Sequence, residues 1–212
     1  MLFDFDGTLA DTAPDLAGAL NRLRNQHALP SLPLEAVRPY ASSGARGLLR
    51  IGFDLAPGDA RYEEMKQAFL AHYDAAICGE TRLFPGIAEL LAQLEARNIA
   101  WGIVTNKATR YTVRLVERLG LAGRAGCVVC GDTTPHIKPH PAPLLAAAER
   151  LALAPVRCSY VGDDLRDIQA AQAAGMASIA VEYGYSGADN GGPRSWNADA
   201  VIARPIDLIG CL

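Results

Sequence analysis

Short apolar runs alternate with amphipathic segments along most of the chain, and this alternation limits the folds open to it. The apolar runs are Met1–Phe5, Trp101–Val104, Cys127–Cys130, Ser159–Val161 and Ser178–Val181. Amphipathic helices are expected between them, beginning near Ile87, Thr109, Pro141 and Leu165. Uninterrupted apolar strands alternating with helices predict an α/β protein whose parallel sheet is covered on both faces. Such sheets bind ligands beyond the carboxyl ends of their strands.

The interval 12–82 departs from this alternation. Its apolar residues have helical spacing only, as Leu16 and Leu20 illustrate. Roughly seventy residues between the first two strands are too many for a single connecting helix. We therefore expect a Rossmann-like parallel sheet core, residues 1–11 and 83–212, with an inserted helical cap, residues 12–82.

Composition restricts the function only broadly. A net charge of −3 over 212 residues gives no electrostatic reason to expect nucleic acid. No apolar stretch reaches about eighteen residues and no signal segment precedes the first motif, so we expect a cytoplasmic monomer or homodimer without a membrane partner. Five irregularly spaced cysteines argue against a secreted disulfide framework. The first run is short for a central strand, so we expect either residues before Met1 or an upstream start codon.

The first apolar run ends in Asp4-Phe5-Asp6-Gly7-Thr8. On an extended chain Asp4 and Asp6 point to the same side, because strand side chains alternate. Two carboxylates held so close repel each other unless a cation or a shared proton compensates. Mg²⁺, which prefers oxygen ligands, is the expected cation, and one carboxylate then remains free for chemistry. The alternative is an acidic turn at a strand end, since Asp-Gly is a common turn dipeptide.

Three further polar clusters fall where strands are expected to end. They are Thr105-Asn106, Lys138-Pro139-His140-Pro141 and Gly162-Asp163-Asp164-Leu165-Arg166-Asp167. Each has a structural alternative: a helix cap for the first, a solvated charge for the second and an acidic complement to a helix dipole for the third. Their order along the chain, after Asp4 and Asp6, favours one shared site.

With these motifs the chain resembles the haloacid dehalogenase superfamily, specifically its phosphatases with a small helical cap. The resemblance covers essentially the whole sequence and is closest to the phosphoglycolate phosphatase group. Four segments resemble one offshoot of that group more closely, the N-acetylmuramic acid 6-phosphate phosphatases. These segments are Ser43-Gly44-Ala45-Arg46, Trp101–Lys107, Gly162–Ile168 and Tyr183-Gly184-Tyr185.

The resemblance implies a Mg²⁺-dependent phosphatase that works through an aspartyl-phosphate. Asp4 would be the nucleophile, and Asp6 the general acid and then the general base. Thr105, Asn106 and Lys138 would bind the phosphate group. The metal ion would be held by Asp4, the Asp6 carbonyl and Asp163, and Asp164 or Asp167 would support these ligands. The cap residues Ser43, Gly44 and Arg46 would contact the rest of the substrate.

The expected substrate is a small phosphorylated metabolite with a carboxylate, because the Arg46 guanidinium suits one. Phosphoglycolate and N-acetylmuramic acid 6-phosphate both carry this group, and an arginine on a helix surface is the alternative interpretation of Arg46. Two other functions remain open. One is a sugar phosphate mutase of the same superfamily, and the other is a phospho-accepting signalling domain of the response-regulator kind.

Overall fold

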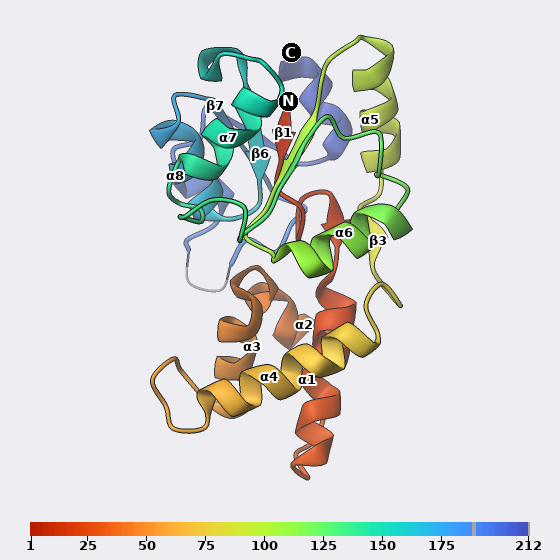
Figure 1. Ribbon diagram of the computed structural model, residues 1–212, viewed down its shortest axis with the longest axis vertical. Helices are drawn as coiled ribbons and strands as arrows, with labels where there is room; N and C mark the ends of the chain where they lie inside the picture. The colour runs from red at the N-terminus through yellow and green to blue at the C-terminus, as the bar shows by residue number, and fades with distance from the viewer. Residues whose placement is uncertain (188–189, 212) are drawn as a thin grey trace.

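The computed structural model describes residues 1–187 and 190–211, which form a sheet-containing lobe and a lobe of helices (Figure 1). Six strands build the sheet: β1 Leu2–Phe3, β4 Gly102–Val104, β5 Val128–Val129, β6 Ser159–Gly162, β7 Ala177–Val181 and β8 Ala200–Ile202. They are all parallel and lie in the order β5-β4-β1-β6-β7-β8. The prediction of an α/β protein with a parallel sheet is therefore confirmed.

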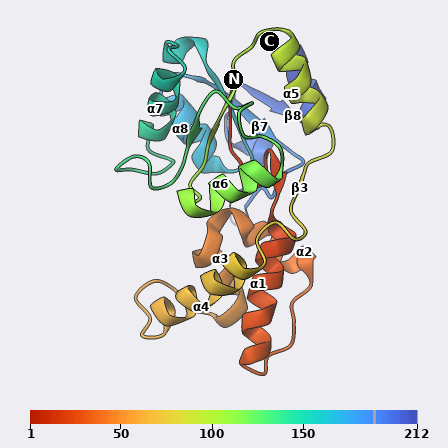
Figure 2. The ribbon, with the colours of Figure 1, turned by 45° about the vertical axis from the view of Figure 1, so that its right-hand side comes forward.

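Helices cover both faces of this sheet (Figure 2). They are α5 Ile87–Ala96, α6 Thr109–Arg118, α7 Ala142–Arg150 and α8 Leu165–Ala173, with the 3₁₀ turns η2 Pro155–Arg157, η3 Pro193–Ser195 and η4 Pro205–Cys211. Leu2 packs into the apolar cluster that contains α7 and α8, whereas its neighbour Phe3 packs into the cluster that contains α5 and α6. The inner strands are thus buried on both faces, which explains why they are continuously apolar.

The second lobe is helical, as expected for the insertion. It contains α1 Ala13–Gln26, α2 Leu34–Val37, the 3₁₀ turn η1 Arg38–Ser43, α3 Gly44–Phe53 and α4 Tyr62–Ala75. Leu16 and Leu20 of α1 are buried together with Met65 and Phe69 of α4, at the spacing that an amphipathic helix gives. None of the described helices is both long enough and apolar enough to cross a lipid bilayer.

Two elements differ from the sequence expectation. An antiparallel ribbon of β2 Ala10–Asp11 and β3 Arg82–Leu83 joins the lobes, and β8 adds a sixth strand at the sheet edge. Each strand of the ribbon has two residues, and the two strands are about seventy positions apart in the chain. No local sequence pattern therefore predicts their pairing. The edge strand β8 is apolar in sequence, but it has only three residues and its Val201 is exposed.

The first strand is also shorter than the apolar run that predicted it. It ends at Phe3, and the chain then turns, because Leu9 and Ala10 both donate their backbone N–H to the carbonyl of Phe5, at 3.1 and 2.9 Å. Asp4 still donates its N–H to the Val161 carbonyl of β6 at 2.9 Å, so it directly extends the strand, whereas Asp6 lies in the turn.

Candidate active site

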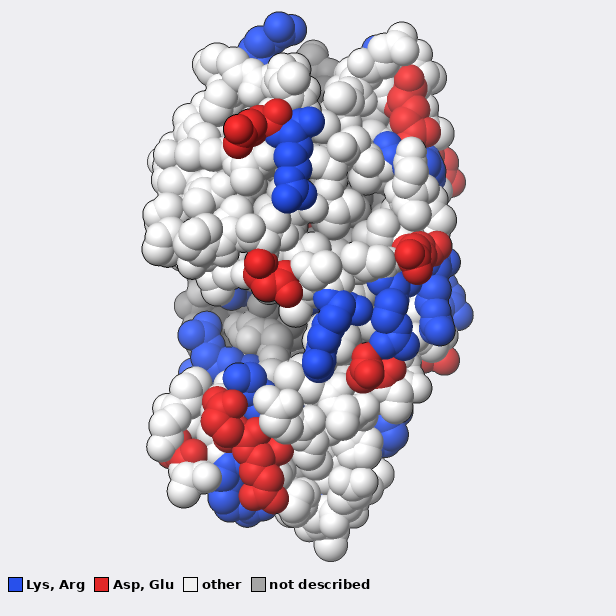
Figure 3. Space-filling model, viewed as in Figure 1, with Lys and Arg blue, Asp and Glu red and all other residues white. Residues whose placement is uncertain are grey.

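The predicted site residues meet at the carboxyl edge of the sheet, opposite the helical lobe. A cavity of about 420 Å³ lies there, and Figure 3 shows the molecule hollowed between its two lobes. The core residues that line the cavity include Asp4, Asp6, Thr105, Asn106, Lys138, Asp164 and Asp167. Strand ends bring these residues together from distant parts of the sequence, as expected for an open α/β sheet, which binds ligands beyond the carboxyl ends of its strands.

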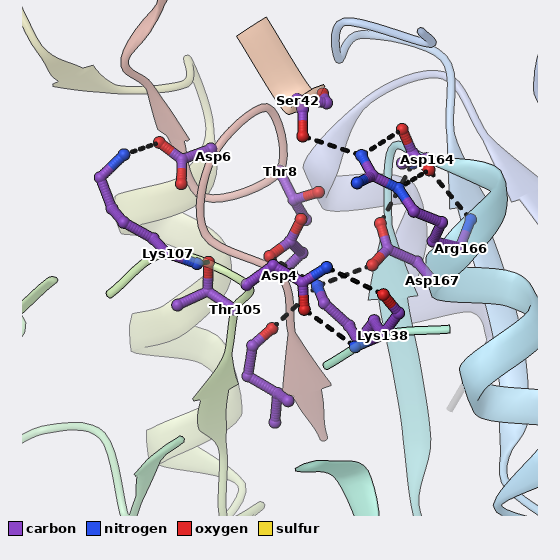
Figure 4. Close-up of polar contacts among 12 residues, drawn as sticks. Asp4, Asp6, Thr8, Ser42, Thr105, Lys107, Lys138, Asp164, Arg166 and Asp167 are labelled. Atoms are coloured by element: carbon purple, nitrogen blue, oxygen red, sulfur yellow. Dashed lines mark hydrogen bonds and ion pairs between the residues drawn. The ribbon is translucent and has the colours of Figure 1, made fainter. Parts of the chain in front are cut away.

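Asp4 lies at the centre of a buried charge network (Figure 4). Its Oδ1 forms an ion pair with Nζ of Lys138 at 2.8 Å but accepts no hydrogen bond. The Lys138 ammonium, 2% exposed, also donates to Asp167 Oδ1 at 2.7 Å and to the Tyr160 hydroxyl at 2.6 Å. Lys138 is thus a fixed cation rather than the solvated surface charge of the alternative interpretation.

Negative charge exceeds positive charge in this network. Carboxylate oxygens of Asp4, Asp163 and Asp167 all lie within 4.8 Å of one another, and all three residues are buried. Burial raises the pKa of Asp4 to about 7, although Lys138 opposes the change. Burial and the neighbouring Asp4 raise the pKa of Asp163 well above its usual range. An incompletely bonded Asp4 oxygen among crowded carboxylates is a donor set that fits Mg²⁺.

Asp163 is held by contacts from the first motif and from the segment at Tyr185. Thr8 Oγ1 donates to its Oδ1 at 2.9 Å, and the backbone N–H of Tyr185 donates to its Oδ2 at 3.0 Å. Gly7 passes so close that a Cβ there would lie 2.1 Å from Asp163 Oδ2, and its φ of +82° is one that side chains disfavour. The glycine of the first motif is therefore required by the close approach to Asp163.

The two other aspartates of the acidic cluster, Asp164 and Asp167, have different roles. Asp164 is the N-cap of α8 and pairs through its carboxylate with Arg166, so the alternative interpretation of the cluster, acidic residues at a helix N-terminus, describes this residue. Asp167 completes the capping box through Oδ2 and binds Lys138 through Oδ1. Asp167 thus belongs to both the helix terminus and the charge network, whereas the Asp164 carboxylate is directed to Arg166.

Asp6 is separated from the network around Asp4. Its Oδ1 accepts from Lys107 Nζ at 2.7 Å and from Thr12 Oγ1 at 2.5 Å. No described group donates a hydrogen bond to its other oxygen, Oδ2. The environments of the two carboxylates differ accordingly, since Asp4 shares the Lys138 cation with Asp167, whereas Asp6 pairs with a different cation, Lys107.

Thr105 and Asn106 follow β4 as predicted, but their side chains have different surroundings. Thr105 is buried and lines the cavity, with its Oγ1 accepting from the Lys107 N–H at 3.1 Å. The Asn106 side chain forms two hydrogen bonds with the backbone of Lys138, to the carbonyl at 3.0 Å and from the N–H at 2.9 Å. Asn106 therefore fixes the loop that presents Lys138.

The predicted substrate residues of the helical lobe face the same cavity. Ser43, Gly44 and Arg46 line it at the junction of η1 and α3. Lys66 of α4 is a second cation on this wall. The rest of this wall is largely apolar and includes Phe69 and Leu70, and Tyr111 and Ile137 line the cavity from the sheet lobe.

Several residues at the site received no role from the sequence. Lys107 contacts Asp6, and Arg166 bonds the Ser42 carbonyl at 2.8 Å across the two lobes. Lys107 directly follows Thr105-Asn106, so its position after a strand end could have predicted that it lies at the site. Tyr73 also lines the cavity, but at its helical spacing it is indistinguishable from a core residue.

Tyr183 and Tyr185 do not line the cavity. The Tyr185 hydroxyl accepts from the N–H groups of Thr12 and Ala13, at 2.6 and 2.9 Å, and donates to Asp11 at 2.9 Å. Tyr185 therefore packs against the connection between the lobes.

Comparison with known proteins identifies the family. The sequence profile described as haloacid dehalogenase-like hydrolase matches residues 1–181. The chain therefore belongs to the haloacid dehalogenase-like hydrolases, as the resemblance of its motifs indicated.

Individual relatives span nearly the whole chain. A phosphoglycolate phosphatase of Xanthomonas campestris is 41% identical over 208 residues, which is 98% of this chain and 93% of the relative. An N-acetylmuramic acid 6-phosphate phosphatase of Pseudomonas aeruginosa is 40% identical over 212 residues, covering 100% and 93% of the two chains. The crystal structure of a predicted phosphoglycolate phosphatase from Haemophilus somnus superposes with a TM-score of 0.86 at 28% identity, covering 99% of this chain and 96% of that one.

Proposed function

We propose that this protein is a Mg²⁺-dependent phosphomonoesterase that forms an aspartyl-phosphate on Asp4. The observation that carries the proposal is the buried cluster of Asp4, Asp163 and Asp167, of which Asp4 and Asp167 line the same cavity as Asp6. The Asp4 and Asp163 carboxylates and the Asp6 carbonyl would hold the ion, supported by Asp167. When bound, the ion would offset the repulsion between the Asp4 carboxylate and an anionic phosphate.

In the first half of the reaction, an Asp4 carboxylate oxygen attacks phosphorus and the bond to the substrate oxygen breaks. Asp6 gives its proton to the departing alkoxide. The Lys138 ammonium lies 2.8 Å from Asp4 and is suited to neutralise charge on the transferring oxygens, together with the Thr105 hydroxyl. Asn106 contributes by fixing the Lys138 loop.

In the second half, Asp6 removes a proton from water, whose oxygen attacks phosphorus and releases phosphate from Asp4. The same carboxyl therefore works in both directions, and its side chain must keep one orientation through both steps. The free Oδ2 of Asp6 is the oxygen available for these proton transfers, since Oδ1 is already bonded to Lys107 and Thr12.

We assign residues 12–82 to a cap that closes on this site and residues 1–11 and 83–212 to the core. The β2–β3 ribbon lies at both junctions, which supports these boundaries. Closure would control the access of water, which a phosphoryl intermediate requires.

Between the two substrates named by the relatives, the cavity favours the larger. Its volume of about 420 Å³ lies in the range of about 300–1,000 Å³ typical of sites for drug-sized ligands. Phosphoglycolate would leave most of that space to water. N-acetylmuramic acid 6-phosphate would fill more of it, with its acetamido methyl group near the apolar wall of Phe69 and Leu70 and its carboxylate near Arg46.

The test is release of phosphate with Mg²⁺, comparing kcat/KM for N-acetylmuramic acid 6-phosphate and phosphoglycolate, with Asp4→Asn as the control. A preference for the sugar supports the proposed substrate, and a preference for phosphoglycolate overturns that choice while supporting the phosphatase. Conversion between sugar phosphate isomers without release of phosphate would establish the mutase alternative. A stable phosphoenzyme formed from acetyl phosphate, without turnover, would establish the signalling alternative.

A further inference from the structure

Lys107 is an unusually enclosed lysine beside the proposed general acid and base. Its side chain is 10% exposed and that of Asp6 is 13% exposed, and their ion pair spans 2.7 Å. Although burial favours the neutral amine, the Asp6 carboxylate raises the pKa of Lys107 above its usual value. The pair is therefore shielded from the solvent that weakens surface ion pairs.

This enclosure is supplied by the helical lobe. The Lys107 ammonium lies 5.1 Å from the centroid of the Tyr73 ring, which belongs to α4. Tyr73 is 2% exposed, and its hydroxyl forms no hydrogen bond within the described chain. The face of an aromatic ring attracts an ammonium ion, and most strongly where water is excluded.

The segment that follows Lys107 binds the same end of α4. Tyr111 of α6 packs edge-on against Tyr73, with ring centroids 5.3 Å apart. Arg114 pairs with Asp74 at 2.5 Å, and Arg118 donates to the Ile77 carbonyl at 2.7 Å. Both views of the ribbon place α6 at the edge of the sheet lobe that faces the helical lobe (Figures 1 and 2). The position of Tyr73 over Lys107 therefore depends on the lobes being closed together.

We propose that Lys107 is a positioning residue for Asp6 and that it responds to cap closure through Tyr73. The inference rests on the proposed function. With the cap closed, Lys107 and Thr12 hold Oδ1 of Asp6 and leave Oδ2 toward the cavity. With the cap open, Lys107 loses its aromatic cover, its ion pair with Asp6 becomes a solvated one, and Asp6 is free to change rotamer. The general acid and base is thus correctly oriented only when the site is closed.

The test uses the Mg²⁺-loaded protein and p-nitrophenyl phosphate, with rapid-quench measurement of both p-nitrophenol and the phosphoenzyme. The p-nitrophenolate group leaves without full protonation, so formation of the phosphoenzyme depends little on Asp6, whereas its hydrolysis depends on Asp6 as base. Lys107→Met should lower the steady-state kcat about 10- to 100-fold, change KM less than about threefold, and accumulate phosphoenzyme. Lys107→Arg should recover part of the lost kcat.

Matched variants separate positioning from structure. Tyr73→Leu removes the ring and should reproduce the accumulation of phosphoenzyme to a smaller extent, and Tyr73→Phe, which restores a ring at this position, should recover part of the kcat that Tyr73→Leu loses. Arg124→Met removes a cation from a distant ion pair with Glu95 and should behave as the parent protein. Thermal unfolding of every variant, with and without inorganic phosphate, reports whether the site remains folded.

Two results would overturn the inference. The first is that Lys107→Met keeps the parent kcat and accumulates no additional phosphoenzyme. The second is that Lys107→Met raises KM and leaves kcat unchanged, which would make Lys107 a substrate-binding cation. If Lys107→Met does not fold, Tyr73→Leu decides, and parent-like kinetics there overturn the coupling to the cap. Absence of turnover in the parent protein itself would instead refute the proposed function, and the inference with it.

Discussion

The hydroxyl of Ser42, in the helical lobe, lies 3.3 Å from Oδ2 of Asp163, at the end of β6. The carbonyl of Ser42 also accepts from Arg166 of α8 (Figure 4). The segment that precedes the proposed substrate residues is therefore bonded to a carboxylate that we propose as a metal ligand. Binding of the ion at Asp163 and closure of the cap are expected to influence each other through this contact.

Replacing the proposed nucleophile should abolish turnover without unfolding the protein. Asp4→Asn removes the attacking oxygen, and it also removes a buried charge, so thermal stability should not fall. Asp6→Asn should leave only residual turnover, because proton transfer is lost while the nucleophile remains. Phosphate release and circular dichroism measure the two effects. Near-normal activity of Asp4→Asn would contradict the assignment of the nucleophile.

The stability of the metal-free protein should decrease as pH rises from about 4 to 7. The raised pKa values of Asp4 and Asp163 mean that the folded protein keeps protons that the unfolded chain releases above about pH 4. Across this interval, the raised pKa of Asp4 should lower the free energy of unfolding by roughly 2–4 kcal/mol. Mg²⁺ displaces these protons, so its stabilising effect should increase with pH.

Thermal unfolding in EDTA and in Mg²⁺, at several pH values, measures this linkage. Asp4→Asn is the control, because it removes one of the two titrating groups and should flatten the dependence in EDTA. Equal pH slopes for the parent protein and Asp4→Asn would show that Asp4 does not hold a proton in the folded state.

Loss of the Arg46 guanidinium should weaken binding of carboxylated substrates selectively. Arg46→Ala should raise KM about tenfold for a carboxylated sugar phosphate, because a charge-assisted pair is lost. The KM for p-nitrophenyl phosphate should change little. Arg61→Ala, at the start of α4 and away from the cavity, is the matched control. An equal rise in KM for both substrates would remove the selective role of Arg46.

Asp15 should be a major contributor to stability at the connection between the lobes. Its buried carboxylate accepts from the N–H groups of Glu80 and Thr81 and from the Thr81 hydroxyl, at 2.9, 3.0 and 2.6 Å. Asp15→Ala leaves these donors unpaired and should lower the free energy of unfolding by about 2–4 kcal/mol. Asp59→Ala, which removes an exposed carboxylate bonded to one N–H, should change it little. Urea denaturation compares the two variants.

The sequence predicted most of the sheet and the groups at its edge for one physical reason. Inner parallel strands must be apolar on both faces, so β4 and β6 are visible as runs, and Thr105 and Asp163 follow directly from where those runs end. Contacts between distant turns have no such periodic signature. The Lys107–Asp6 ion pair spans 101 positions and the Ser42–Asp163 hydrogen bond spans 121, so neither could be predicted from a local pattern.

The order of strands in the sheet also governs how the protein can assemble during its synthesis. Strand β1 is translated first, yet Leu2 pairs with Gly102 on one side and Tyr160 on the other. Helices α1 to α4 are close in sequence and can pack much earlier, because local contacts form faster than distant ones. The segment that carries Asp4 therefore remains an unpaired apolar edge until most of the chain has left the ribosome. During that interval the nascent protein is most exposed to aggregation and most dependent on chaperones.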